Sequence, residues 1–198
     1  MRRSDLHPDP FVQFERWFAD ARAADFPVPE AMTLATATAD ARPSARTVLL
    51  KGVDERGFRF HTNYESRKGR ELEDNPRATL LFLWHVEPRR QAIVEGPVSR
   101  VPAEESEAYF RTRPRGGQLA AWASRQSTRI ESRDALEQAF ADADRTYPGD
   151  VPLPERWGGL ALAPERFEFW ESGANRLHDR FEYVRGDAGG WEIFRLSP

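Results

Sequence analysis

The sequence contains no cysteine, almost no lysine and no long apolar run. Without cysteine, disulfides, thiolate metal sites and thiol nucleophiles are excluded. Charged residues make up 31% of the chain and the mean hydropathy is -0.70, which leaves no stretch suited to spanning a bilayer. The charged opening, residues 1–5, leads into proline-rich sequence and lacks the apolar segment of a signal peptide. We therefore expect a cytoplasmic protein that does not engage membranes.

The charge balance is slightly acidic. The 198 residues include 29 Lys+Arg and 32 Asp+Glu, a net charge of -3, so the chain lacks the positive field of a general nucleic-acid binder. Only Lys51 and Lys68 are lysines, and a high-GC coding bias is an alternative explanation for the excess of arginine. The length suits a single domain, 1–198. Any role of the basic residues must therefore be local.

The hydrophobic pattern changes from helical to extended near residue 31. Asp9 and Pro10 suit a helix start, which predicts an N-terminal helical segment within residues 1–26. Extended runs follow at 32–38, 45–51, 58–62, 78–84 and 91–101. Helices are expected at 66–74, 103–112, 117–124 and 132–144, and strands at 158–163, 166–171, 178–184 and 191–196, with a turn at 186–190. Short connections favour antiparallel pairing, so we expect a mainly β protein with helices (α+β), built as a barrel closed by sequence-distant strands.

Two basic segments lie in the first third of the chain. Arg67 and Lys68 follow Ser66 at a predicted helix start, where backbone N–H groups and two cations can converge on an anion; a solvated, ordinarily capped helix start is the alternative. Arg46 and Lys51 lie near the two ends of an otherwise apolar strand, which suggests a nearby anion. Strict alternation places these two side chains on opposite faces of that strand unless a bulge intervenes.

Two further segments combine cations with other polar or aromatic groups. Tyr109 and Arg113 are four residues apart on a predicted helix and could hold a phosphate, although a solvated surface helix explains them equally well. If residues 176–180 are extended, Arg176, His178 and Arg180 share one face and would repel one another without an anionic partner. The sequence shows no metal-ligand spacing, nucleophile elbow, P-loop or dinucleotide fingerprint, so we expect no metal site.

Taken in order, seven segments of the chain resemble those of the pyridoxine/pyridoxamine 5'-phosphate oxidase family. They are residues 46–51, residues 62–63 with 66–68, residues 109–114, residues 124–127, residues 157–159, residues 169–170 and residues 176–180. The resemblance implies an FMN-binding split β-barrel, antiparallel with peripheral helices. It also implies a homodimer with FMN at sites built from both subunits, with residues 155–198 as the C-terminal dimerisation and active-site strands.

The same resemblance assigns roles to individual residues. The FMN phosphate would be held by Arg46, Arg67 and Lys68. The rest of the cofactor site would comprise Val48, Lys51, His61, Thr62, Gln91, Gln126, Ser127, Trp170 and Arg180. The substrate phosphate would be bound by Lys51, Tyr109, Arg113 and Gly117, and the catalytic residues at the substrate ring would be Arg176 and His178.

The implied reaction oxidises pyridoxamine or pyridoxine 5'-phosphate to pyridoxal 5'-phosphate and reduces O2 to H2O2. His61 stands where the family usually has a tyrosine, and Gly117 replaces a serine, leaving at best a backbone N–H. The segment that covers the substrate in some members has no counterpart before the first helix. The alternatives are an oxidase of another reduced heterocycle, of the phenazine-pathway type, and a flavin-binding protein without turnover.

Overall fold

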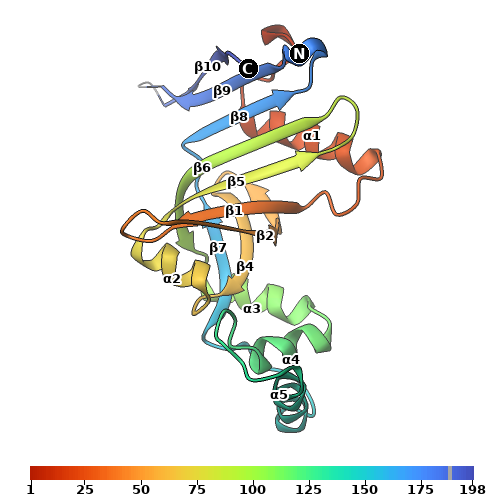
Figure 1. Ribbon diagram of the computed structural model, residues 1–198, viewed down its shortest axis with the longest axis vertical. Coiled ribbons are helices and arrows are strands. Elements are labelled where there is room, and N and C mark those ends of the chain that lie inside the picture. Colours follow the sequence, from red (N-terminus) through yellow and green to blue (C-terminus); the bar gives the residue numbers. More distant parts are fainter. Residues whose placement is uncertain (187–188) are drawn as a thin grey trace.

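The computed structural model describes residues 1–186 and 189–198, and its main feature is a curled antiparallel sheet of ten strands (Figure 1). The strands are β1 (Ala31–Ala37), β2 (Pro43–Leu49), β3 (Gly52–Asp54), β4 (Gly57–Asn63), β5 (Arg77–Trp84), β6 (Arg90–Arg100), β7 (Trp157–Leu162), β8 (Arg166–Glu171), β9 (Asp179–Arg185) and β10 (Trp191–Leu196). The helices are α1 (Pro10–Ala23), α2 (Arg67–Asp74), α3 (Ala103–Thr112), α4 (Arg115–Ala123) and α5 (Arg133–Thr146). None of the described helices combines the length and apolar character needed to cross a bilayer.

The expected antiparallel α+β class is confirmed, and each predicted helix and strand has a counterpart. The short strand β3 was not predicted, because three residues are too few to show alternation. Strands β9 and β10 pair in antiparallel fashion, but the turn predicted at 186–190 includes residues 187–188, which lie outside the described residues.

The long strand β6 gives the sheet its curl. One path through the sheet runs β10-β9-β8-β6-β5-β1-β2, while β7 joins β6 to β4, and β4 in turn pairs with β3. Residues 90–95 of β6 pair with β8, whereas residues 98–100 pair with β7. Gly96 lies where the partner changes, and a Cβ there would lie 1.9 Å from the carbonyl oxygen of Ala163. Strands distant in sequence therefore meet around β6, as expected for a barrel closed late in the chain.

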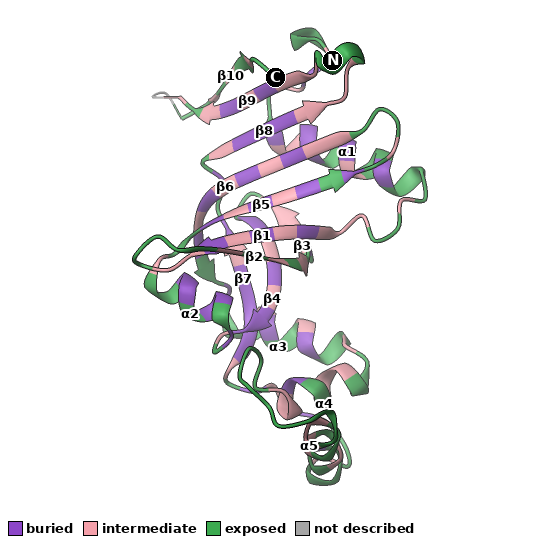
Figure 2. Ribbon diagram, in the orientation of Figure 1, coloured by how far each residue is buried: buried purple, intermediate pink, exposed green. Residues whose placement is uncertain are grey.

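Aromatic residues dominate the main core between α1 and the sheet. The fully buried Phe14 ring lies 4.8 Å from the Phe58 ring and 4.9 Å from the Phe82 ring, measured between centroids. Helix α1 is held at its start by Asp9, whose side chain accepts a hydrogen bond from the N–H of Phe11. Figure 2 shows buried residues alternating with less buried ones along the strands, so only one face of this part of the sheet is fully covered.

Helices α3, α4 and α5 share a second, smaller core, separate from the first. It contains Phe110, Leu119, Ala121, Ala143, Val151 and Trp157. Trp157 opens strand β7, so this residue ties the helical cluster to the sheet (Figure 1). The second core thus fixes α3 and α4 beside the ends of β2 and β4, where a cavity forms.

We expect Phe14→Ala to lower the free energy of unfolding by about 3–5 kcal/mol, because it removes a fully buried ring from the main core. Urea denaturation followed by tryptophan fluorescence measures this change. Phe140→Ala is the matched control, since Phe140 is 36% exposed on α5 and its loss should cost less than about 1 kcal/mol. Equal costs for the two variants would contradict this description of the core.

Candidate functional site

A cavity of about 1010 Å³ lies between the sheet and helices α2, α3 and α4. Many of the residues predicted to bind cofactor or substrate line it, namely Arg46, Val48, Lys51, His61, Thr62, Arg67, Lys68, Tyr109, Arg113, Gln126 and Ser127. Within the described residues, the lining includes five Lys or Arg side chains and no carboxylate. The cavity therefore presents a strongly positive interior on a protein whose net charge is negative.

Arg46 and Lys51 line the same cavity, although alternation predicted opposite faces. Alternation fails because β2 ends at Leu49. Leu50 turns into the core, where it is 4% exposed, and the backbone N–H of Lys51 donates to the carbonyl of Arg59 at 2.7 Å. The chain has thus left the strand geometry before it reaches Lys51, and no bulge within the strand is needed.

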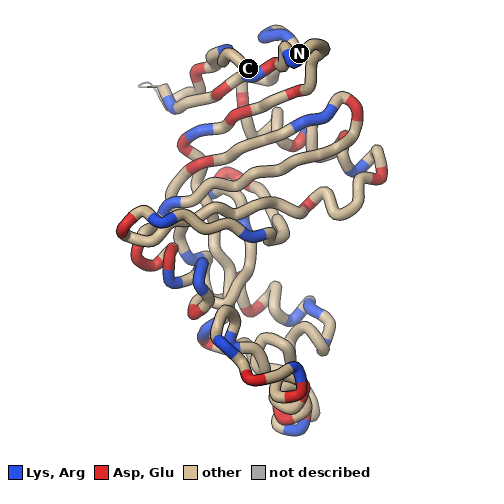
Figure 3. Tube along the Cα trace, viewed as in Figure 1, with Lys and Arg blue, Asp and Glu red and all other residues tan. Residues whose placement is uncertain are grey.

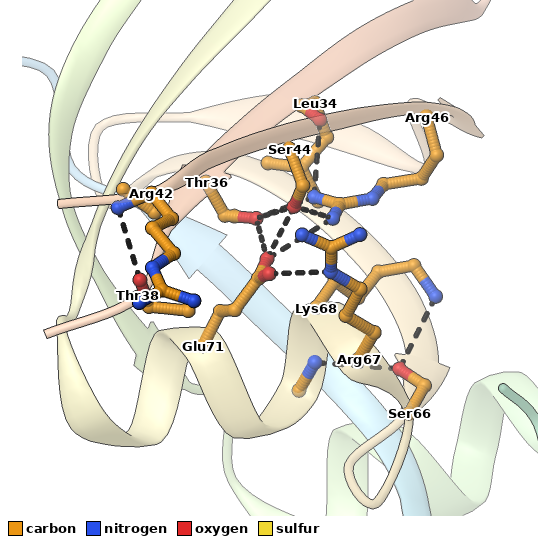
Figure 4. Close-up of polar contacts among 12 residues, drawn as sticks. Leu34, Thr36, Thr38, Arg42, Ser44, Arg46, Ser66, Arg67, Lys68 and Glu71 are labelled. Atoms are coloured by element: carbon orange, nitrogen blue, oxygen red, sulfur yellow. Dashed lines mark hydrogen bonds and ion pairs between the residues drawn. The ribbon is translucent and has the colours of Figure 1, made fainter. Parts of the chain in front are cut away.

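Arg46 and Arg67 converge at one end of the cavity, with the carboxylate of Glu71 between them (Figure 4). Glu71 lies behind the cavity wall and was not identified from the sequence. The spacing of Arg67 and Glu71, four residues apart on a helix, is the signal that could have found this pair. The first turn of α2 also lies here, so its free N–H groups face the same region as the arginines.

Lys68 is a buried cation with neutral hydrogen-bond partners. It is 7% exposed, and its Nζ donates to Thr62 Oγ1 at 2.9 Å, to Ser66 Oγ at 3.2 Å and to Gln126 Oε1 at 2.8 Å. Burial, followed by the positive charge of Arg46, lowers the pKa of Lys68 to about 8. Within the part of the chain that the structure describes, no carboxylate pairs with Lys68, so its charge remains available to an anion.

At the opposite end of the cavity, His61, Tyr109 and Trp157 form a stack of parallel rings. The centroids of His61 and Tyr109 are 3.9 Å apart, and those of His61 and Trp157 are 5.3 Å apart. Burial, followed by the positive charges of Lys51, Arg113 and Arg59, lowers the pKa of His61 to about 4. His61 is therefore a neutral, flat group at pH 7.

Arg113 lies beside this stack, just beyond the end of α3. Its backbone is extended, so the prediction that it shares a helical face with Tyr109 was wrong, but both side chains still line the cavity. The guanidinium lies 4.7 Å from the ring centroid of Trp157, and its NH1 group is buried without a hydrogen-bond partner. Burial lowers the pKa of Arg113. A buried donor without a partner marks this end of the cavity as suited to an acceptor ligand.

Gly117 does not line the cavity, and its backbone N–H donates to the carbonyl of Pro114 at 2.8 Å. From the sequence, this backbone N–H was the one polar group that Gly117 could offer to a ligand. It is already hydrogen-bonded within the first turn of α4. A Cβ at this position would lie 3.3 Å from the NH2 atom of Arg113, so Gly117 borders the anion-binding candidate without contributing a polar group.

The other predicted residues form a second group, outside this cavity. Gln91, Trp170 and Arg180 are cross-strand neighbours on β6, β8 and β9, and the ring of His178 lies 4.6 Å from that of Trp170. Directly opposed residues project from the same face of a sheet, so three of these side chains form a row. Arg180 already donates to Glu168 at 3.0 Å and to the carbonyl of Ser197 at 3.0 Å.

Arg176 belongs to a 3₁₀ turn, Ala174–Arg176, and not to an extended strand. Its φ of 64° and that of Asn175, 55°, are left-handed, and β9 begins only at Asp179. Residues 176–180 are therefore not extended throughout, and the condition under which Arg176, His178 and Arg180 would share one strand face is not met. Arg176 is exposed near the half-buried His178, whose Nδ1 accepts a hydrogen bond from the N–H of Gly173 at 3.1 Å.

We expect the imidazole of His61 to titrate near pH 4 in the folded protein, compared with an ordinary value of 6.5. Nuclear magnetic resonance of the ring C–H signals measures this midpoint, and Lys51→Met should raise it because one repelling cation is removed. Arg111→Met, on the exposed side of α3, is the control. Because the unfolded chain takes up this proton near 6.5, the free energy of unfolding should fall as the pH drops from 6.5 towards 4. A midpoint near 6.5 in the folded protein would contradict the burial and charge described here.

Two family models match the chain. Residues 18–147 match a model described as pyridoxamine 5'-phosphate oxidase, and residues 157–198 match the pyridoxine 5'-phosphate oxidase C-terminal dimerisation region. The interval between the two matches is the loop that connects α5 to β7. The second match covers the segment from β7 to β10; Trp170 and Arg180 lie on strands of this segment, and Arg176 and His178 lie between β8 and β9.

Curated proteins and solved structures agree with these matches. The chain is 58% identical over 192 residues to a pyridoxine/pyridoxamine 5'-phosphate oxidase of Rubrobacter xylanophilus, covering 96% of this chain and 88% of that protein. It is 54% identical over 195 residues to a protein of the same name from Paraburkholderia phymatum, covering 98% and 92%.

Among solved structures, PhzG from Burkholderia lata 383, in complex with tetrahydrophenazine-1-carboxylic acid, superimposes with a TM-score of 0.92 at 33% identity, covering 98% of this chain and 95% of that one. A pyridoxamine 5'-phosphate oxidase-related, FMN-binding protein from Nostoc punctiforme, 20% identical, shares the fold with a TM-score of 0.75, covering 98% of this chain and 100% of that one. The expected split barrel is confirmed, and the chain belongs to the pyridoxamine 5'-phosphate oxidase family.

Proposed function

We propose that this chain is an FMN-dependent oxidase that converts pyridoxamine 5'-phosphate and pyridoxine 5'-phosphate into pyridoxal 5'-phosphate and reduces O2 to H2O2. The observation that carries the proposal is the cavity with five Lys or Arg side chains and no carboxylate in its described lining. Such charge is costly to bury without a counter-ion, so the cavity suits anionic ligands. The curated relatives at 58% and 54% identity carry the name of this activity.

We assign the FMN phosphate to the end formed by Arg46, Arg67 and Lys68. The fit is supported by Lys68, a buried cation with neutral partners, and by the N-terminal turn of α2 beside it. The remaining cavity residues assigned to the cofactor are Val48, Lys51, His61, Thr62, Gln126 and Ser127. The volume of about 1010 Å³ is at the upper end of ligand pockets, which suits a cofactor and a substrate together.

We assign the substrate phosphate to Lys51, Tyr109 and Arg113. A phosphate oxygen here would accept a hydrogen bond from the buried NH1 of Arg113, which otherwise has no partner. The neutral ring of His61 adds no charge to this end and leaves the binding of the anion to Lys51 and Arg113. Gly117 supports the position of Arg113 by leaving space beside it.

We assign Gln91, Trp170, Arg176, His178 and Arg180 to the site of a second copy of the chain. These residues lie outside the cavity of their own chain, on strands and a turn within or next to the matched dimerisation region. In a homodimer with two-fold symmetry, each chain would supply this group to the cavity of its partner. The arrangement would complete two equivalent sites, each with FMN at the interface.

In this proposal the residues of the chain bind and orient, and FMN held at Arg46, Arg67 and Lys68 would supply the two-electron redox chemistry that links oxidation of the substrate to reduction of O2. Lys51, Tyr109 and Arg113 fix the substrate by its phosphate, which limits the positions available to the reacting carbon. Arg176 and His178 of the partner copy would hold the pyridine ring against the cofactor. Arg176 is exposed on its left-handed turn, as such a role requires.

A second candidate function is oxidation of a reduced heterocycle of the phenazine type. It is favoured by the TM-score of 0.92 to PhzG, whose structure contains tetrahydrophenazine-1-carboxylic acid. That ligand carries a carboxylate and no phosphate. The two candidates therefore differ in the group that Lys51 and Arg113 would bind, a phosphate or a carboxylate. Activity assays with phosphorylated and with unphosphorylated substrates distinguish the two candidates.

The direct test is to purify the protein, record its absorption spectrum, and measure O2-dependent aldehyde formation from both phosphorylated vitamers. A bound flavin spectrum and turnover of either vitamer are expected. A colourless protein that cannot bind added FMN would overturn the proposal. A yellow protein inert towards both vitamers would leave the heterocycle oxidase or a flavin-binding protein without turnover.

We expect Arg113→Ala to raise the KM for the vitamer phosphate about tenfold or more with a smaller change in kcat, because a charge-assisted hydrogen bond to the substrate is lost. Arg176→Ala should lower kcat as well, because it removes a group next to the reacting ring. Steady-state kinetics separates the two effects. Arg133→Ala, on the exposed face of α5, is the control and should match the wild type. Identical kinetics for the Arg113 and Arg176 variants would argue against the division of roles.

Mixing these two variants tests the shared site. After subunit exchange, half of the dimers pair one variant with the other, and each such dimer contains one cavity with both Arg113 and the partner's Arg176 intact. At low substrate concentration, activity should recover to about one quarter of the wild-type value. No recovery, despite exchange verified by mass spectrometry, would mean that both groups act within one chain.

A further inference from the structure

Glu71 lies at the centre of the polar network behind the two arginines (Figure 4). Its Oε2 accepts hydrogen bonds from Thr36 Oγ1 at 2.5 Å, from Ser44 Oγ at 2.5 Å and from the NH2 group of Arg46 at 3.1 Å. Its Oε1 accepts from the Nε of Arg67 at 2.8 Å. Within the described residues, no other carboxylate contacts either arginine.

The Glu71 carboxylate is buried and ionised. Its side chain is 4% exposed. Burial alone would raise the pKa of Glu71, but the hydrogen bonds from Ser44, Thr36, Arg67 and Arg46 outweigh it and lower that pKa to about 2. Glu71 therefore keeps its negative charge and all of its partners throughout the neutral range.

The contacts of Glu71 determine how each arginine is presented to the cavity. Arg67 is 59% exposed and, within the described part of the chain, is held only through its Nε, which leaves its terminal NH1 and NH2 groups as available donors. Arg46 is held from behind through NH1 and NH2, which donate to Leu34, Thr36, Ser44 and Glu71, so its Nε remains free. Both guanidinium groups are thus fixed while N–H donors stay available.

We propose that Glu71 is a positioning residue for the cofactor phosphate, one that orders Arg46 and Arg67 before the phosphate binds. This inference rests on the proposed function, since it takes the FMN phosphate to bind at these arginines. A free arginine loses much rotamer freedom when it binds a ligand, and a carboxylate that has already fixed it removes most of that loss. Arg67 gains most, because Glu71 is its one hydrogen-bond partner within the described residues.

A carboxylate beside the phosphate cradle, which consists of Arg46, Arg67 and Lys68, could also weaken phosphate binding, since it attracts the same cations that would bind the phosphate. The geometry favours positioning over competition for two reasons. Glu71 is buried and does not line the cavity, and it takes up only one N–H of Arg67. Three cations, Arg46, Arg67 and Lys68, remain against a single carboxylate, so the cradle keeps a net positive charge.

The test compares FMN with riboflavin, which lacks the phosphate. Apoprotein is prepared from the full chain, and the Kd of each flavin is measured from the quenching of flavin fluorescence. The ratio of the riboflavin Kd to the FMN Kd reports only the contribution of the phosphate. Glu71→Gln keeps the size of the side chain but presents an NH2 group to neighbouring donors, so we expect this ratio to fall about tenfold while the riboflavin Kd changes less than about twofold.

Glu137→Gln is the matched control, because Glu137 pairs with Arg133 at the same helical spacing on the exposed helix α5 and should leave the ratio unchanged. In an Arg67→Ala background the effect of Glu71→Gln should shrink, since the main residue that it positions is gone. Glu71→Asp keeps the negative charge but has a shorter side chain, so it should also lower the ratio of the riboflavin Kd to the FMN Kd. This variant replaces Glu71→Gln in the test if the Gln variant does not fold.

An unchanged or increased ratio in Glu71→Gln would overturn the inference, and an increase would identify Glu71 as a competitor of the phosphate. The proposed function fails in a different way. If the wild-type protein itself binds FMN no more tightly than riboflavin, no phosphate cradle exists at these residues.

Discussion

Positive charge without a matching carboxylate is the constraint on which the site depends. On the sheet, the half-buried Arg166 pairs with Glu168 on its own strand and with Glu95 and Glu182 on the two neighbouring strands. Arg113, by contrast, has no ion pair among the described residues and keeps a buried N–H without a partner. Among the described residues, Arg166 is therefore surrounded by carboxylates, whereas Arg113 and Lys68 in the cavity wall have none. That contrast is stronger support for an anionic ligand than the number of arginines, which coding bias could explain.

The curled sheet brings these charges together from segments far apart in the chain. Arg46 comes from β2, Lys68 from the start of α2 and Arg113 from the end of α3. Lys68 lies in the first turn of α2 and Arg113 directly follows α3, whereas Arg46 is the central residue of β2. Because β6 pairs with both β8 and β7, strand β2, the end of β4 and the helices α3 and α4 come to surround one space. The position of the cavity is thus a consequence of the curl.

Local patterns in the sequence predicted most of the secondary structure and the helix start at Arg67 and Lys68. They failed where the chain leaves regular geometry. Lys51 lies past the end of β2, and Arg176 lies in a left-handed turn, so period-two alternation does not apply to either. Glu71 was missed because its partners Thr36 and Ser44 are distant in sequence and meet it only through the packing of α2 against β1 and β2. The site residues were assigned by family resemblance, and their contacts came from the tertiary structure.

Trp157 belongs to the helical core and also forms part of the cavity wall. The cavity is therefore bounded on one side by the sheet and α2, and on the other by helices that have an independent core. Substitutions in α3 to α5 can reshape the end of the cavity at Tyr109 and Arg113 while the phenylalanine-rich core and the end at Arg46 and Arg67 remain intact. This separation provides a route for diversification: the helical cluster can change one wall of the cavity while the sheet and its phenylalanine-rich core stay as they are.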